Sequence, residues 1–63
     1  MEIGKFKPYK GFVGTIEVDD GGHHGKLLDI DDFVNYTANS LEELETEYHK
    51  AVDDYLSFLN ELR

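Results

Sequence analysis

The three histidines are the first residues whose chemistry could serve a catalytic or metal site. His23 and His24 are adjacent, and adjacent side chains on a strand point to opposite faces, so one metal ion cannot easily use both. His49 has Glu45 and Asp53 one helical turn away on either side, a spacing that could hold an imidazole as a general base. No serine, threonine or lysine nucleophile is patterned beside it. We therefore interpret His49 as a residue on a solvated flank of a helix.

The acidic residues could also hold a metal ion. Residues 29–32 resemble a fragment of a calcium loop, but the twelve-residue spacing, the central glycine and the terminal glutamate of such loops are absent. Asp53 and Asp54 are neighbours on a helix, where their directions diverge by about 100°. The chain has no cysteine, which excludes disulfides, thiolate metal sites and a cysteine nucleophile. We expect no catalytic residues, no metal and no cofactor, and hence a protein that is not an enzyme.

The charge of the chain favours a basic partner. Fourteen Asp and Glu face six Lys and Arg, a formal net charge of −8, and residues 11–63 hold thirteen acids against three bases. Such a chain repels phosphate backbones, so we expect no direct nucleic-acid binding and a basic protein as partner. No apolar run is long enough for a membrane span, and the N-terminus has no secretory signal. A small cysteine-free domain suits the reducing cytoplasm.

Three segments have the apolar alternation and flanking turn residues of strands. We expect strands at residues 9–18, 23–30 and 33–38, joined as an antiparallel meander, and a loosely ordered arm at residues 1–8. On the first strand, Phe12 and the apolar residues spaced two apart after it share one face.

Glycines mark the points where this sheet must turn or pack closely. Asp19-Asp20-Gly21-Gly22 is a strong turn signal, because glycine supplies the positive φ that tight hairpins need. Gly11 and Gly14 weaken the interior of the expected first strand. Each therefore indicates either a bulge or the close approach of another group.

The clearest element is a helix over residues 40–62. Ser40 and Glu43 form a capping box, in which the hydroxyl accepts a hydrogen bond from a first-turn N–H and the carboxylate reaches back to the N–H of the cap residue. Apolar residues recur at helical spacing and fill one broad arc. The arc contains Leu44, Tyr48, Ala51, Val52, Tyr55, Leu56, Phe58, Leu59 and Leu62. It is wider than one sheet face requires, so its flanks at Phe58 and Leu56 are expected to cover a second surface, in this chain or another.

These elements predict one α+β domain over residues 1–63, a three-stranded antiparallel meander with one C-terminal helix on one face (β-β-β-α). The opposite face of the sheet has only partial apolar cover. The sheet also ends in two open edges, which favour strand addition or protein contact.

Three segments resemble the N-terminal domain of HicB-type antitoxins. They are Tyr9-Lys10-Gly11-Phe12-Val13-Gly14-Thr15-Ile16-Glu17, His24-Gly25-Lys26-Leu27-Leu28-Asp29-Ile30, and Ser40-Leu41-Glu42-Glu43-Leu44 running into His49-Lys50-Ala51-Val52-Asp53-Asp54-Tyr55-Leu56. The resemblance covers about residues 9–59, and the Ala-Val-Asp-Asp-Tyr-Leu stretch is its most specific part. It implies a partial RNase H-like fold that binds and blocks a small toxin, similar to double-stranded-RNA-binding domains, that cleaves mRNA.

The chain departs from this family pattern in two respects. Family antitoxins usually continue into a C-terminal DNA-binding domain, whereas this sequence stops at Arg63 with no basic segment beyond the helix, so autorepression is not assigned to it. A true RNase H holds Mg²⁺ with clustered carboxylates, one of them on the first strand. Residues 13–16, in the middle of the expected first strand, contain no carboxylate, and the first one is Glu17 at the end of the strand. Nuclease activity is therefore not expected.

Together, the residues and the resemblance predict a cytoplasmic antitoxin domain that neutralises a small basic, HicA-like toxin by protein contact. The alternative is a stand-alone structural or regulatory domain that self-associates and has no catalytic activity. A C2 homodimer could bury the surplus apolar arc, as could the toxin. The residues expected to contact a basic partner are Asp29, Asp31 and Asp32 in the turn and Glu43, Glu47 and Asp54 on the helix.

Overall fold

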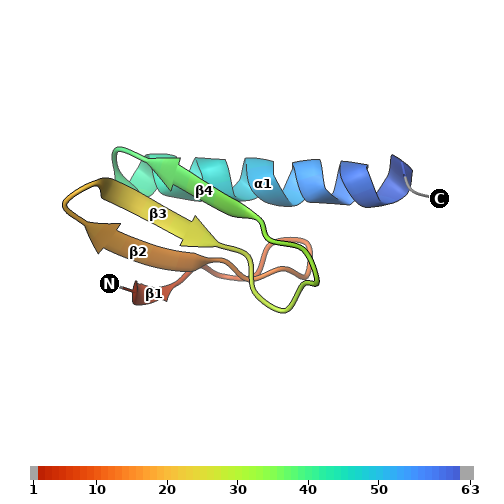
Figure 1. The fold of residues 1–63 in the computed structure, drawn as a ribbon, viewed down its shortest axis with the longest axis horizontal. Coiled ribbons are helices and arrows are strands. Elements are labelled where there is room, and N and C mark those ends of the chain that lie inside the picture. Colours follow the sequence, from red (N-terminus) through yellow and green to blue (C-terminus); the bar gives the residue numbers. More distant parts are fainter. Residues whose placement is uncertain (1, 62–63) are drawn as a thin grey trace.

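An antiparallel sheet and one long helix form two layers in the computed structural model, which describes residues 2–61 (Figure 1). The elements are β1 (Glu2–Lys5), β2 (Thr15–Asp19), β3 (Gly22–Lys26), β4 (Asn35–Ala38) and α1 (Leu41–Glu61). The strands lie in the order β1-β2-β3-β4, and α1 packs across one face of the sheet. The α+β class is confirmed, but the prediction of three strands was wrong, because the sheet has four.

The additional strand lies in the segment that we expected to be an arm. Glu2–Lys5 pairs antiparallel with β2, with a shift of register between Glu2 and Gly4. Beyond the strand, the N–H of Phe6 donates to the carbonyl of Gly14 at 2.9 Å. The Phe6 ring stacks on Tyr48, with ring centroids 5.0 Å apart. The register shift lies within this strand of four residues and interrupts the alternation that identifies a strand, which is why the pattern of residues 1–8 did not reveal it.

A tight turn replaces the first half of the strand expected at residues 9–18. The N–H groups of Tyr9 and Phe12 each donate to the carbonyl of the other, at 2.8 and 2.9 Å. Lys10 and Gly11 between them have φ angles of 52° and 88°, and two successive positive φ angles are typical of a type I′ hairpin turn. Gly11 is therefore explained by backbone conformation, and β2 begins only at Thr15.

The turn between β2 and β3 is confirmed. Gly22, where β3 begins, has a φ of 116°, and the Asp19 carboxylate accepts the Gly21 N–H at 2.8 Å. The expected strands at 23–30 and 33–38 were too long, because β3 ends at Lys26 and β4 begins at Asn35. Asp29, at a φ of 59°, turns the chain away from the sheet between them.

The helix begins where the capping box placed it. The Ser40 hydroxyl accepts the N–H of Glu43 at 3.2 Å, and its carbonyl accepts the N–H of Leu44 at 2.9 Å. The Glu43 carboxylate reaches the N–H of Asn39 at 3.5 Å instead of that of Ser40 as expected. Leu62, which we placed on the apolar arc, lies outside the described residues.

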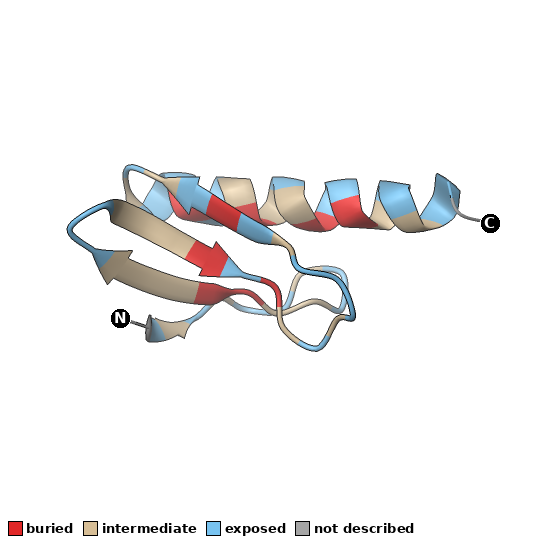
Figure 2. Cartoon of the chain, in the orientation of Figure 1, coloured by how far each residue is buried: buried red, intermediate tan, exposed pale blue. Residues whose placement is uncertain are grey.

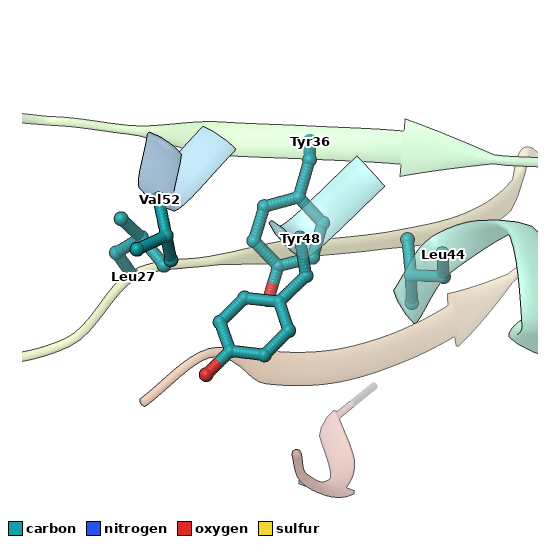
Figure 3. Packing of buried hydrophobic residues seen from close by; sticks show 5 residues of the cluster. All are labelled: Leu27, Tyr36, Leu44, Tyr48 and Val52. Atoms are coloured by element: carbon teal, nitrogen blue, oxygen red, sulfur yellow. The ribbon is translucent and has the colours of Figure 1, made fainter. Parts of the chain in front are cut away.

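The core lies between α1 and the β3–β4 side of the sheet (Figures 2 and 3). It consists of Leu27, Tyr36, Leu44, Tyr48 and Val52. Tyr55 is also buried, which confirms its predicted place on the core-facing arc. Gly14 is explained by close packing, since a β-carbon there would lie 2.7 Å from the Tyr48 ring.

Hydrogen bonds of two buried hydroxyl groups join β2 to its neighbours in the sheet beneath α1. The Tyr36 hydroxyl donates to the carbonyl of Thr15 at 2.8 Å. The Thr15 hydroxyl in turn accepts the N–H of Lys26 at 3.0 Å. The Tyr36 hydroxyl therefore holds a carbonyl that would otherwise pair across β2 and β3. Gly25 is required here, because a β-carbon would overlap the Thr15 carbonyl and the Tyr36 ring.

Candidate partner-binding groove

A groove of about 700 Å³ runs between β4 and α1, and we refer to it as the β4–α1 groove. Its wall on the sheet side is the chain from the 29–32 turn into β4. Its wall on the helix side is a single stripe, since residues three and four apart share one helix face. The lining residues are Asp32, Phe33, Val34, Asn35, Tyr36, Thr37, Glu47, Lys50, Ala51, Asp54, Tyr55 and Phe58.

Two phenylalanines give the groove exposed apolar surface. Phe33 is 81% exposed and Phe58 is 46% exposed. Phe58 stacks on Tyr55, with ring centroids 6.5 Å apart. Phe58 was expected to cover a second surface, and among the described residues nothing covers it fully. Exposed aromatic side chains around a hollow are typical of a surface that contacts another molecule.

Carboxylates form the polar part of the same groove. Lys50 Nζ lies 3.4 Å from Glu47 Oε2, and both side chains are exposed. Asp32 and Asp54 have no cationic partner within residues 2–61. Burial raises the pKa of the Tyr55 hydroxyl, and the nearby Asp32 carboxylate raises it further. The groove therefore combines an apolar floor with an excess of negative charge.

The structure brings some of the predicted contact residues together and separates others. Asp32, Glu47 and Asp54, from the turn and from the helix, line the β4–α1 groove. Asp29 and Asp31 are exposed in the same turn but do not line it. Glu43 lines a second hollow near the start of the helix.

The second hollow contains the adjacent histidines. His24 Nε2 lies 2.8 Å from Asp19 Oδ2, and this hydrogen bond is the main cause of the lowered pKa of the Asp19 carboxyl. His23 pairs with Val18 and His24 with Glu17, so their side chains lie on opposite faces of the sheet. His23 Nδ1 is buried and has no hydrogen-bond partner within the described part of the chain. In residues 2–61, no group of three or more metal-ligating side chains is placed to hold an ion.

His49 does not form a dyad with Asp53. Its ring stacks under Tyr9, with centroids 4.0 Å apart, so the helix flank is partly covered rather than fully solvated. Asp53 Oδ1 instead lies 2.7 Å from Lys10 Nζ and 3.3 Å from the Tyr9 hydroxyl. The Lys10 ammonium lowers the pKa of the Asp53 carboxyl, chiefly through that hydrogen bond. This cluster fastens the hairpin turn to α1.

Sequence reasoning did not identify Phe33 and Lys50 as site residues. Phe33 was placed at the start of the strand expected at residues 33–38, whereas it precedes β4 and is largely exposed to solvent. Its position next to the acidic 29–32 turn was the only available signal. Lys50 was named only within the segment that resembles the HicB-type domain, and its contact with Glu47 follows from their separation by three residues on α1.

Comparison with known proteins does not assign the chain to a family. Within residues 2–61, no helix combines the length and the apolar character that spanning a membrane would require. No protein-family model matches the chain, and no curated protein or solved structure shows significant similarity to it.

Proposed function

We propose that this chain is a HicB-like antitoxin domain that binds a small basic mRNA-cleaving toxin in the cytoplasm and neutralises it by protein contact. The observation that carries the proposal is the β4–α1 groove, where exposed Phe33 and Phe58 lie beside the carboxylates of Asp32 and Asp54. The resemblance of residues 9–59 to HicB-type domains supports the same function. No catalytic step is part of this proposal.

The chemistry of an RNA-cleaving toxin explains why such a groove would inhibit it. An enzyme that binds RNA needs a basic face, and carboxylates can occupy that face in place of phosphates. Exposed charge pairs mainly accelerate encounter and set orientation. Aromatic anchors supply most of the affinity once they are desolvated. The carboxylates would therefore guide the encounter, and the two phenylalanines would hold the bound partner.

The test is inhibition of RNA cleavage by the small basic protein encoded beside the gene for this chain. The two proteins should co-purify, and cleavage should stop at equimolar addition of the chain. Phe33→Ala should weaken inhibition at least about tenfold, because truncation of an aromatic hot spot costs about 2 kcal/mol or more. Glu45→Lys, on a helix face outside the groove, is the matched control for Asp54→Lys. Absence of such a neighbour, or full inhibition by Phe33→Ala, would contradict the proposal.

The alternative is a self-associating domain, favoured by the half-exposed Phe58 and the open edge of β4. A dimer through the groove would place Asp32 and Asp54 of both copies close together, and like charges oppose that contact. Analytical ultracentrifugation at micromolar concentration distinguishes the two. A species of 7.2 kDa excludes the dimer, and a species of twice that mass supports it.

A further inference from the structure

We infer that the partner binds by strand addition, as an extended basic segment that pairs with the outer edge of β4 and directs alternate side chains into the β4–α1 groove. The inference rests on the proposed function and deepens it, because it specifies how the partner is held. Three independent observations support it: the direction of the β4 backbone groups, the contrast between the two sheet edges, and the spacing of the helix stripe.

Backbone groups of β4 point away from the sheet at alternate residues. Within residues 2–61, β4 has a strand neighbour only on its β3 side. The N–H of Leu27 donates to the carbonyl of Val34 at 3.0 Å, which sets the alternation of this ladder. Val34 and Tyr36 therefore direct their backbone groups toward β3. The N–H and C=O groups of Asn35 and Thr37 point outward, where a further strand can pair with them.

The two edges of the sheet differ in how well they accept another strand. β1 has an irregular register between Glu2 and Gly4 and carries the exposed Lys5, and bulges and lysines are features that discourage edge pairing. β4 pairs in an unbroken register over Asn35–Ala38 and carries no charged side chain. Strand addition is therefore expected at β4.

The helix stripe matches the repeat of an added strand. Side chains on one face of a strand recur about every 6.8 Å, and one step of four residues along a helix covers about 6 Å. Successive inward side chains of an added strand would thus meet Ala51, then Tyr55, along the groove. The C-terminal half of α1 extends past the strands, so the stripe continues beyond β4 (Figure 1).

The charge of the groove selects a basic segment over a second copy of this chain. Asp32 and Asp54 lack a cationic partner within residues 2–61, so an arginine or lysine at an inward position of the added segment would supply one. A second copy would bring its own β4, which has no basic residue, together with the same two carboxylates. The occupant of the groove is therefore an extended segment in which basic and apolar residues occupy the inward positions.

The test uses NMR with a synthetic heptapeptide in which arginine and valine occupy alternate positions and threonine the others. Titration into ¹⁵N-labelled protein should shift the amides of Asn35, Thr37 and Phe58 and slow hydrogen exchange at Asn35 and Thr37. A matched peptide with glutamate for arginine should not bind. Because the peptide is defined, this result does not depend on whether a toxin exists, and RNA cleavage assays test the proposed function separately.

Two pairs of variants separate edge pairing from charge. Thr37→Pro removes an outward N–H, which edge strands tolerate, and should weaken peptide binding at least about tenfold, while Thr37→Ala should keep it. Asp54→Lys should weaken binding of the arginine peptide about fivefold, and Glu45→Lys less than about twofold. Peptide shifts on β1, equal binding by Thr37→Pro with an intact fold, or concentration-dependent shifts on β4 without peptide would overturn the inference.

Discussion

Gly14 lies against the aromatic centre of the core, and its replacement by alanine should destabilise the domain. A β-carbon at this position would lie 2.7 and 2.8 Å from two atoms of the Tyr48 ring and would overlap the Tyr36 hydroxyl. Tyr48 is fully buried and Tyr36 is 6% exposed, so neither ring can move into solvent. Overpacking of this kind typically costs about 1–3 kcal/mol. A domain of this size has about 3–5 kcal/mol in total, so Gly14→Ala removes a large fraction of it.

Thermal unfolding followed by circular dichroism measures this effect. One kcal/mol corresponds to about 4–8 °C in a domain of this size, so Gly14→Ala should melt at least about 4 °C below the parent. Gly4→Ala is the matched control, because a β-carbon there meets nothing within 4 Å. Gly4→Ala should melt at the parent temperature or slightly above it. Equal melting of the two variants would refute the packing of Tyr48 on Gly14.

Three further predictions follow from the cap, the core edge and the charges. Tyr55→Ala should cost about 3–5 kcal/mol and leave the isolated domain largely unfolded, whereas Ser40→Ala should cost about 1 kcal/mol and leave it folded; identical melting curves would contradict the burial of Tyr55. Lys10→Met should raise the pKa of the Asp53 carboxyl toward its ordinary value of 3.8, as measured by NMR titration. Because the folded pKa is lowered, that pair stabilises the parent above pH 3.8 and its contribution is lost as the pH falls further, so the parent should lose more stability on acidification than Lys10→Met. Association with the toxin should slow as salt rises, since charges are screened over about 8 Å at physiological ionic strength, and a flat rate in stopped-flow measurements would count against electrostatic steering.

Local signals in the sequence account for the elements that were predicted correctly. The helix start follows from Ser40 and Glu43, and the turn at Asp19 to Gly22 follows from residue types that adopt its backbone angles. The apolar period placed Tyr55 on the buried face because Leu44, Tyr48, Val52 and Tyr55 recur at helical spacing on one face of α1. These predictions depend only on residues near one another in the sequence and not on which elements pack together.

The β1–β2 hairpin could not be predicted from local sequence signals. Its turn places Lys10 at a positive φ, whereas asparagine, aspartate or glycine is the usual signal there. The alternation expected of a long strand also continues through the turn, since Phe12 and Ile16 both pack against the core.

The β4–α1 groove could not be predicted from the sequence because it depends on how the elements pack together. Asp32 and Asp54 are 22 positions apart in the sequence, and only the docking of α1 beside β4 brings them to one surface.

Tyrosine hydroxyls connect the core to backbone carbonyls in β2 and just before it. The Tyr48 hydroxyl lies 2.6 Å from the carbonyl of Phe12 and therefore ties α1 to the end of the β1–β2 hairpin. Burial raises the pKa of the Tyr36 and Tyr48 hydroxyls, so both remain protonated donors at neutral pH.

The two contacts of the Tyr48 hydroxyl, with the carbonyls of Lys7 and Phe12, help to fix the rotation of α1, and that rotation decides which helix residues face the outer edge of β4. Core packing and partner binding therefore depend on one helix orientation. A partner that binds only the native groove adds about 2.7 kcal/mol of stability at a hundredfold excess over its Kd. That gain is comparable to the loss expected for Gly14→Ala, so the partner should restore the melting temperature of this variant. Partner binding that leaves the melting of Gly14→Ala unchanged would show that the partner does not bind the native state preferentially.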